Sequence, residues 1–430
     1  MSGARVHDSV PHTARPPRPR RGALLAGSVG NFVEWYEFGV YGYFATVIAA
    51  RFFTPVGGNE TEGLVRTYAS FALAFFFRPV GAALFGRLGD RIGRRPVLIL
   101  VIALMTGATT LIGVLPTYAT VGALAPWLLT FLRMVQGLSA GGEFGGAVSV
   151  MTEFAPPGRR GLYGSWQSFT VALGLLGGAG VAALLATVLT EGQLSDWGWR
   201  VPFLLTLPMG LVALGLRLRL EETPAFRHEG RRERPPGREV ARAVVLGAGR
   251  VMGWSAAGYT FLVVLPSYLQ NTLHTGFRQA LLVTVVANLG FAATIVPAGL
   301  LSDRIGRRPV LLTGAGLVVV LSVPLLNLLQ DTGASNAVKG LAVCGAGAVV
   351  GLMAGPGPAM LSEMFPTSVR HTGLGLAYAL SNAVFSGCAG LIITETMKRT
   401  GSVDIPAYYA AATCAVSALA LATLTDNRGS

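Results

Sequence analysis

The chain has 430 residues, of which 52% are hydrophobic and only 13% are charged, and it contains 57 glycines. Ordinary soluble proteins carry about 25% charged residues, so the composition excludes a chain built from soluble domains. The net charge of +13 also raises nucleic-acid binding as a possible function, which the positions of the cations decide.

Apolar runs of roughly 20 residues alternate with polar loops along the whole chain and predict twelve transmembrane helices. Membrane helices tolerate the high Gly and Pro content because small residues allow close packing and neighbouring helices satisfy freed backbone groups. The predicted spans are residues 22–50, 66–88, 97–117, 122–150, 161–190, 200–219, 243–270, 279–300, 309–329, 337–360, 372–397 and 404–424.

The loop cations predict the orientation of these spans. Of the 34 Lys and Arg residues, 25 lie on the side of the N-terminus, seven lie opposite, and two, Arg78 and Arg133, lie inside spans. The positive-inside rule therefore places both termini in the cytoplasm of a multi-pass protein of the cell (inner) membrane. The cations then mark solvated loop ends near anionic lipid, and nucleic-acid binding is not supported.

The predicted organisation has two halves of six helices. It comprises a cytoplasmic leader (1–21), an N-terminal half (22–219), a cytoplasmic linker (220–242), a C-terminal half (243–424) and a cytoplasmic tail (425–430). The apolar run after the leader is too long for a signal peptide, so we expect the leader to stay uncleaved. Cys344, Cys388 and Cys414 lie in apolar spans without paired spacing, which predicts packing residues and no metal site.

Ionisable side chains inside the N-terminal spans are the first candidate functional residues. An ionised side chain at mid-membrane costs at least about 2.5 kcal/mol, so several of them predict mutual pairing or a wet cavity. The carboxylates Glu34 and Glu37 share one face of the first span, and Arg133 begins a polar stripe on the fourth. The full set of candidates for proton coupling and solute binding is Glu34, Glu37, Arg78, Arg133, Gln136 and Glu143.

Two interpretations of these candidate residues are possible. Carboxylates in a wet cavity can load and release protons, and an arginine that pairs only with the ionised form would tie protonation to conformation. On this reading Glu34, Glu37 or Glu143 carries a coupling proton, and Arg133 changes partner or meets an anionic solute group. On the other reading, a fixed ion-pair network only positions the first, second and fourth helices.

A repeated loop relates the two halves. Residues 86–98 and 299–311 share Asp-Arg-Ile-Gly-Arg-Arg-Pro-Val-Leu at an offset of 213, and a weaker echo follows spans 4 and 10 at an offset of 210. This parallel repetition predicts two related bundles, and we expect the loop charges to hold the cytoplasmic ends together when the site faces outward. The gate residues are Gly86, Asp90, Arg91, Gly93, Arg94, Arg95, Glu153 with Arg160, Asp303, Arg304, Gly306, Arg307, Arg308, and Glu363 with Arg370.

The C-terminal spans hold aromatic and amide candidates in place of charges. Such groups suit hydrogen bonds or aromatic-cation contacts with a small solute, although single aromatic residues on membrane helices also serve as packing. The candidate cavity residues are Trp254, Tyr259, Asn288, Tyr378, Asn382 and Phe385, the last three at spacings i, i+4 and i+7.

The twelve-span plan and the duplicated loop resemble the major facilitator superfamily. Residues 30–39 (Gly-Asn-Phe-Val-Glu-Trp-Tyr-Glu-Phe-Gly), 133–143 and 221–226 resemble its metabolite:proton symporter family, although Glu37 stands where that family usually carries Asp. The resemblance implies an all-α, twelve-helix fold and proton-coupled uptake of a small polar solute, such as proline, betaine, 2-oxoglutarate or shikimate. It also implies no cofactor, no ATP, and function as a monomer whose partners are solute, protons and lipid.

The same sequence also bears on other function classes. An ATP-driven pump is excluded because neither lysine, Lys339 or Lys398, lies in a phosphate-binding loop. Residues 137–141 spell the Gly-x-Ser-x-Gly pattern of hydrolases, but inside a predicted helix and without a mid-span histidine, so an enzyme is not expected. An antiporter, an efflux carrier or a uniporter of the same superfamily remains the alternative.

Overall fold

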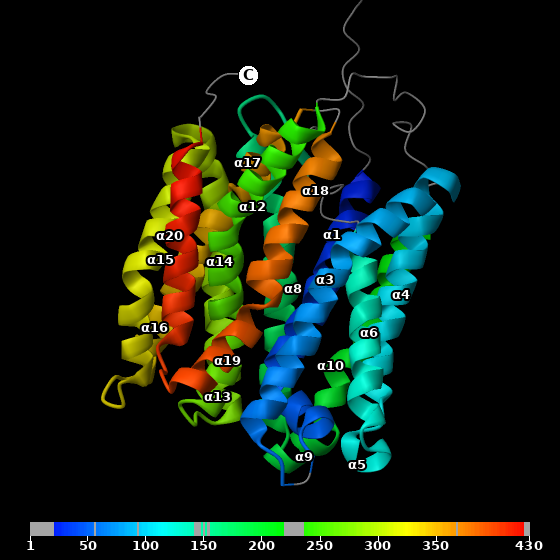
Figure 1. The fold of residues 1–430 in the computed structure, drawn as a ribbon, viewed down its shortest axis with the longest axis vertical. Coiled ribbons are helices and arrows are strands. Elements are labelled where there is room, and N and C mark those ends of the chain that lie inside the picture. The colour runs from blue at the N-terminus through cyan, green and yellow to red at the C-terminus, as the bar shows by residue number, and fades with distance from the viewer. Residues whose placement is uncertain are drawn as a thin grey trace, which may run out of the picture.

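The computed structural model describes residues 21–424 except for residues 56, 93, 142–147, 149–150, 153–154, 219–235 and 367–368. Every regular element in this part of the chain is a helix, as the sequence predicts. Figure 1 shows two bundles side by side, blue to green for the first half and green to red for the second. The beginning of α1 and the end of α20 lie at the same end of the molecule, called the upper end below as it is drawn there.

Within the described residues, the N-terminal half forms six long helical paths, several of them interrupted by turns. The first path continues from α1 through α2 into the π-helical segment η1 towards the lower end, and short helices form the lower-end connections. Its helices are α1 (Arg21–Tyr43), α2 (Ala45–Ile48), η1 (Ala49–Phe53), α3 (Glu60–Ile92), α4 (Arg94–Val114), α5 (Tyr118–Val121), α6 (Leu124–Ala140), α8 (Arg160–Val188), α9 (Glu191–Asp196), η2 (Gly198–Arg200), α10 (Val201–Leu204) and α11 (Thr206–Leu218).

The C-terminal half repeats this plan with two π-helical segments inside its long paths, η4 and η5. Its first helix begins at Gly237, so residues 237–242 of the predicted linker are helical. Its helices are α12 (Gly237–Tyr259), η4 (Thr260–Val264), α13 (Leu265–Asn271), α14 (Phe277–Ile305), α15 (Arg307–Gln330), α16 (Asn336–Ala354), α17 (Gly357–Met364), α18 (Arg370–Ser381), η5 (Asn382–Gly387), α19 (Ala389–Thr400) and α20 (Ile405–Ala422).

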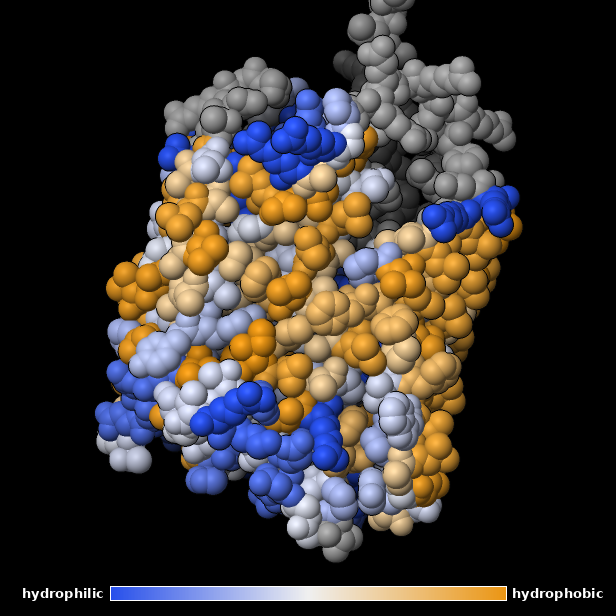
Figure 2. All heavy atoms as spheres, in the orientation of Figure 1, coloured by the Kyte–Doolittle hydropathy of each residue, from blue (hydrophilic) through white to orange (hydrophobic). Residues whose placement is uncertain are grey.

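The outer surface of both bundles is apolar across its middle. Figure 2 shows a broad hydrophobic band with hydrophilic side chains gathered at the two ends. Trp127, Leu341 and Leu419 are each more than 70% exposed, which water would oppose and lipid favours. Nine helices of the described residues are long and apolar enough to cross a membrane. The other three predicted spans correspond to α1, to α6 and to α12 with η4 and α13.

Glycines at equivalent positions bring equivalent helices into contact in the two halves. A Cβ atom at Gly137 on α6 would overlap the backbone of Ala74 on α3, and one at Gly347 on α16 would overlap the backbone of Ala287 on α14. The two glycines are 210 positions apart and the two alanines 213, the offsets of the sequence repeat. Close approach of small residues is the usual basis of helix packing in lipid, so the repeat extends from the loops into the packing of the bundles.

Candidate functional site

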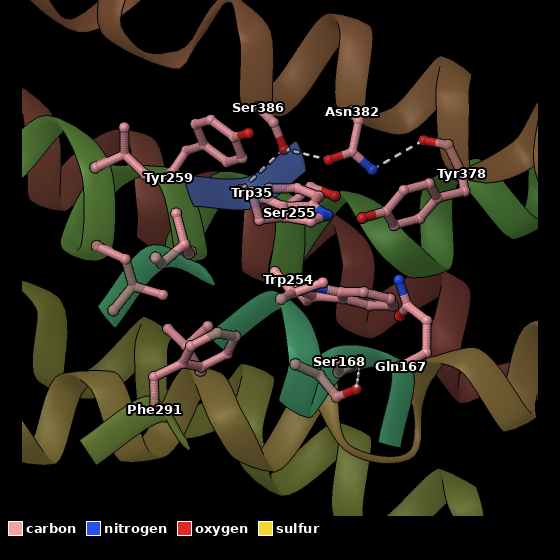
Figure 3. A pocket seen from close by; sticks show the side chains of 17 residues that line it. Trp35, Gln167, Ser168, Trp254, Ser255, Tyr259, Phe291, Tyr378, Asn382 and Ser386 are labelled. Carbon is pink, nitrogen blue, oxygen red and sulfur yellow. Dashed lines mark hydrogen bonds between the residues drawn. The ribbon is translucent and has the colours of Figure 1, made fainter. Parts of the chain in front are cut away.

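A central cavity lies between the two halves and is lined from both. Figure 3 shows the rings of Trp35, Trp254, Tyr259 and Tyr378 gathered around it. The Trp254 and Tyr378 ring centroids are 5.9 Å apart, and those of Trp35 and Tyr259 are 6.3 Å apart. The remaining lining residues are Gln167, Ser168, Val171, Leu175, Ser255, Gly258, Leu262, Val263, Phe291, Val350, Ala354, Asn382 and Ser386.

Contacts join the two halves on both sides of the cavity. Towards the lower end, the hydroxyls of Tyr68 and Ser267 lie 2.7 Å apart, and Lys398 on α19 forms an ion pair with Glu62 on α3. Towards the upper end, Ser168 donates to the carbonyl of Ala354 at 2.7 Å. The cavity volume is about 40 Å³. Clefts for drug-sized ligands are roughly 300–1,000 Å³, so binding of a solute requires the halves to separate on one side.

The structure separates the C-terminal candidates into two groups. Trp254, Tyr259, Tyr378 and Asn382 line the central cavity, whereas Asn288 and Phe385 do not. The side-chain amide of Asn288 instead donates to the Tyr43 hydroxyl at 3.3 Å and to the Thr284 carbonyl at 2.9 Å, so it joins α14 to α1.

The displacement of Phe385 has a local cause. Its predicted position rested on the 3.6-residue period of an α-helix, counted from Tyr378. The segment Asn382–Gly387 is π-helical, and its wider turn changes the register by about one residue. Ser386 therefore faces the cavity, where its hydroxyl donates to Asn382 Oδ1 at 2.9 Å (Figure 3).

Several lining residues were not predicted from the sequence, and Gln167 on α8 is the most polar of them. Within the described residues, its Nε2 atom has no hydrogen-bond partner, nor have the hydroxyls of Ser255 and Tyr259. All three groups are buried in the cavity wall. Buried polar groups are almost always hydrogen-bonded, so these three are available to a solute or to water. Only the three-dimensional arrangement distinguishes Gln167 from an ordinary polar residue on a small-residue helix.

Arg78 and Glu34 form a buried ion pair beside this cavity. Arg78 Nη2 lies 3.2 Å from Glu34 Oε1, and the two residues are only 4% and 6% exposed. The guanidinium also lies over the rings of Phe75 and Phe38, at 4.3 and 4.4 Å from their centroids. Ion pairing and cation–π contacts together offset part of the cost of taking the charge out of water.

Arg133 reaches Glu37 through two intermediates. Its Nη1 donates to Gln136 Oε1 at 2.6 Å, Gln136 Nε2 donates to Thr109 Oγ1 at 2.5 Å, and Thr109 donates to Glu37 Oε2 at 2.7 Å. We call these four residues the Arg133–Glu37 chain. All four are at most 1% exposed. Arg133 makes no ion pair with a carboxylate among the described residues, and its guanidinium lies 4.1 Å from the centroid of the Tyr41 ring.

A second, smaller cavity of about 20 Å³ adjoins the first. Glu34 and Arg78 line it, together with Asn31, Ala140, Gly141, Gly375 and Ala379. Trp35 and Tyr378 line both cavities, so the rings of these two residues separate the Glu34–Arg78 ion pair from the central cavity. Although Glu34 and Glu37 share a face of α1, they engage different helices, α3 and α4.

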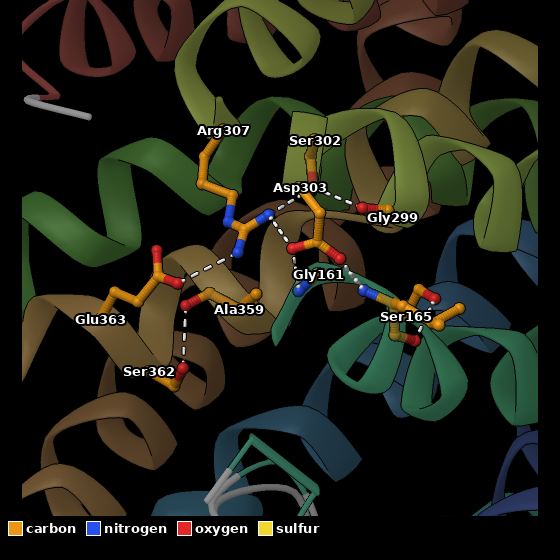
Figure 4. A network of polar contacts seen from close by, with 10 residues as sticks. Gly161, Ser165, Gly299, Ser302, Asp303, Arg307, Ala359, Ser362 and Glu363 are labelled. Atoms are coloured by element: carbon orange, nitrogen blue, oxygen red, sulfur yellow. Dashed lines mark hydrogen bonds and ion pairs between the residues drawn. The ribbon is translucent and has the colours of Figure 1, made fainter. Parts of the chain in front are cut away.

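Polar contacts join the halves at the upper end, as Figure 4 shows. Asp303 at the end of α14 accepts hydrogen bonds from the backbone N–H groups of Gly161 and Leu162, at 2.8 and 2.9 Å. These are free N–H groups at the start of α8, where the helix dipole also favours a carboxylate. Arg307 Nη1 lies 2.7 Å from Asp303, and its Nη2 lies 3.2 Å from Glu363.

The other predicted gate residues differ in position. Glu363 pairs with Arg307 and not with Arg370, whose Nε donates to the carbonyl of Phe365 at 3.3 Å. Gly306 adopts a φ of 103°, which permits the tight turn between α14 and α15. Arg91, Arg304 and Arg308 are exposed, Arg160 is half-buried, and Gly86 lies in α3. The predictions on Gly93, Glu143 and Glu153 lie outside the described residues, as do those on the side chains of Asp90, Arg94 and Arg95.

Comparison with known proteins gives consistent results over nearly the whole chain. The family model described as "Sugar (and other) transporter" matches residues 23–246 and again 236–425. The chain is 35% identical over 405 residues to the proline/betaine transporter of Escherichia coli strain K12, covering 90% of this chain and 80% of that protein. It is 36% identical over 384 residues to the alpha-ketoglutarate permease of the same strain, covering 88% and 87%.

Solved structures show the same fold. The crystal structure of a D-xylose-proton symporter superposes with a TM-score of 0.78, at 19% sequence identity, over 95% of this chain and 99% of that one. The fold predicted from the spans and the repeat is therefore confirmed, and the relatives are transporters and not enzymes.

Proposed function

This chain belongs to the sugar (and other) transporter family of the major facilitator superfamily, and we propose that it acts within this family as a proton-coupled symporter. The observation that carries the proposal is the position of the buried charges. Glu34 and Arg78 lie one ring away from a cavity that both halves line, and Glu37 is joined to Arg133 by the chain through Gln136 and Thr109. Buried carboxylates next to arginines are the groups that can couple proton binding to movement of the halves.

The orientation in the membrane and the functional unit are part of the same proposal. The excess of Lys and Arg in the loops of the upper end supports a cytoplasmic location of that end, and of both termini. Uptake then carries the solute from the lower end to the upper end by alternating access. The central cavity is lined by residues from both halves. We propose that the protein acts as a monomer and uses the proton gradient in place of a cofactor.

The cavity favours a solute without net charge. Among the described lining residues none is ionised, so a dicarboxylate would be buried there without a cation in contact. Aromatic rings line the cavity, and their faces attract an ammonium group, while the unpartnered amide of Gln167 can donate to a carboxylate. We therefore propose a zwitterion of the size of proline or betaine as the solute, ahead of 2-oxoglutarate or shikimate.

Uptake into proteoliposomes with an imposed pH gradient tests both parts of the proposal. We expect labelled proline or betaine to accumulate about tenfold more with the gradient than without it, which corresponds to ~1.4 kcal/mol. Gradient-driven accumulation of 2-oxoglutarate instead would refute the zwitterion but keep the symporter. Accumulation that is independent of the gradient would refute symport and indicate a uniporter, and solute export coupled to proton entry would indicate an antiporter.

Asp303→Asn should slow transport while leaving solute binding largely intact. The substitution removes the charge that accepts from Gly161 and Leu162, so the upper end closes less firmly. Hydrogen bonds to a charged group contribute about 1.5–3 kcal/mol, which predicts uptake roughly tenfold slower. Uptake rate and calorimetric binding of proline are the two measurements. Asp331→Asn, in the loop between α15 and α16, is the control, and loss of binding in Asp303→Asn would contradict a gating role.

A further inference from the structure

The direction of each hydrogen bond in the Arg133–Glu37 chain is fixed by chemistry. A guanidinium only donates, so the atom of Gln136 that faces Arg133 must be its carbonyl oxygen. The amide nitrogen of Gln136 must then donate to the hydroxyl of Thr109. The hydroxyl proton of Thr109 remains, and the structure gives it two acceptors: Glu37 Oε2 at 2.7 Å and the carbonyl of Met105 at 3.0 Å.

These two acceptors correspond to the two protonation states of Glu37. When Glu37 is ionised it can only accept, so the Thr109 hydroxyl donates to it and every donor in the chain points from Arg133 towards the negative charge. When Glu37 carries a proton, its own O–H can donate to Thr109, whose hydroxyl then turns to the Met105 carbonyl on the preceding turn of α4. No buried group loses its partner in either state.

We propose that Thr109 is a positioning residue that transmits the protonation state of Glu37 to Arg133. The inference rests on the proposed proton-coupled function and deepens it, because it assigns the coupling proton to Glu37 and names the group that responds to it. The proton itself enters Glu37 from water and leaves the same way. The hydroxyl of Thr109 only changes its acceptor, and Gln136 and Arg133 then face a neutral group.

Other charged and titratable groups surround the Arg133–Glu37 chain, and none of them is changed in the Thr109 variants described below. Tyr36 on α1 interacts electrostatically with Glu37, and Tyr41 on α1, Arg78 on α3 and Tyr259 on α12 interact with Arg133. Glu34 on α1 interacts with Arg78 and Tyr259. Tyr41 and the ring of Phe71 cover the guanidinium of Arg133, at 4.1 and 4.9 Å from their centroids. Among the four residues of the Arg133–Glu37 chain, only Thr109 has a polar group that a methyl group can replace without a change of charge or shape.

The test compares four variants of the full-length protein in proteoliposomes. Thr109→Val removes the hydroxyl and keeps the shape, and Thr109→Ser keeps the hydroxyl. Thr110→Val is the matched control on the same helix, since its hydroxyl faces Thr206 at 3.3 Å outside the chain. Glu37→Gln identifies the carboxyl group. One readout is the infrared band of a protonated carboxyl on acidification, and the other is the ratio of proton-driven proline uptake to proline–proline exchange.

We expect an infrared carboxyl band in the wild type that is absent in Glu37→Gln. The band should change position in Thr109→Val, because its frequency reports the lost hydrogen bond, and should stay in place in Thr109→Ser and Thr110→Val. The ratio of driven uptake to exchange should fall about tenfold in Thr109→Val, as the loss of a hydrogen bond to a charged group implies. Thr109→Ser should restore that ratio to about the wild-type value, as the retained hydroxyl implies.

The outcomes separate this inference from the proposed function. An unmoved band in Thr109→Val would overturn the inference whichever solute the protein carries. A wild-type ratio in Thr109→Val with a collapsed ratio in Glu37→Gln would overturn the role of Thr109 and leave symport intact. Wild-type proton-driven uptake in Glu37→Gln would overturn the assignment of the coupling proton itself, and the inference with it.

Discussion

Glu37→Gln is expected to reduce proton-driven uptake of proline about 100-fold, a loss of ~2.7 kcal/mol, while proline–proline exchange continues. Glutamine has the size of glutamic acid and can accept from Thr109 as Glu37 does, so the packing of α1 against α4 is retained. It resembles the protonated carboxyl and cannot release a proton. The carrier should therefore still exchange solute across the membrane, but without drawing on the pH gradient.

Three further variants test whether the effect is specific to Glu37. Glu60→Gln, at the lower end of α3, replaces an exposed carboxylate and should transport as the wild type does. Glu34→Gln and Glu143→Gln replace the other two predicted coupling groups. Wild-type accumulation in all three variants of Glu34, Glu37 and Glu143 would contradict proton coupling through the N-terminal half and favour the fixed ion-pair reading of the same residues.

The fold could be predicted because its determinants are local. Apolar runs of the length of a membrane and loop cations are visible within single segments, and the repeat is visible as a match at a fixed offset. The structure confirms the two helical halves that they predict. The packing of Gly137 on Ala74, repeated as Gly347 on Ala287, follows the same offsets. The packing of one half is therefore repeated in the other half, and the repeat in the sequence predicts it.

The site was less predictable because it depends on contacts between residues that are far apart in the sequence. Arg78, Glu34, Arg133 and Glu37 stood out because a charge in an apolar span is costly, and the structure groups them in the N-terminal half. Thr109 carries no such signal, since a threonine in a membrane helix usually donates to its own backbone, as Thr109 also does to Met105. Its second acceptor comes from a helix 72 positions away in the sequence.

Local helix geometry accounts for another difference between the predicted and observed cavity. An α-helical period places Tyr378, Asn382 and Phe385 on one face, but the π-helical turn of η5 puts Ser386 in the wall and Phe385 outside it. A second π-helical segment, η4, supplies Leu262 and Val263 to the same wall. Single π-turns recur at functional sites and are not encoded by the hydrophobic pattern, so a count of residues along a span cannot find them.

Arg78→Met is expected to destabilise the folded protein by about 3–5 kcal/mol, because it removes the guanidinium that pairs with the buried Glu34 carboxylate. The thermal transition of the purified protein in detergent measures this loss. Arg66→Met is the matched control. Arg66 lies on the same helix and pairs with Glu62, but its side chain is 56% exposed, and exposed pairs contribute only about 0–1 kcal/mol.

The double variant Glu34→Gln/Arg78→Met then separates structure from function. Replacing a buried ion pair by uncharged side chains of similar volume is often neutral for stability, so the double variant should regain most of the thermal stability that Arg78→Met loses. If the pair takes part in coupling, the double variant should lack proton-driven uptake although its fold is restored. Recovery of both stability and proton-driven uptake would show that the pair only positions α1 against α3, and coupling would then depend on Glu37 and Arg133 alone.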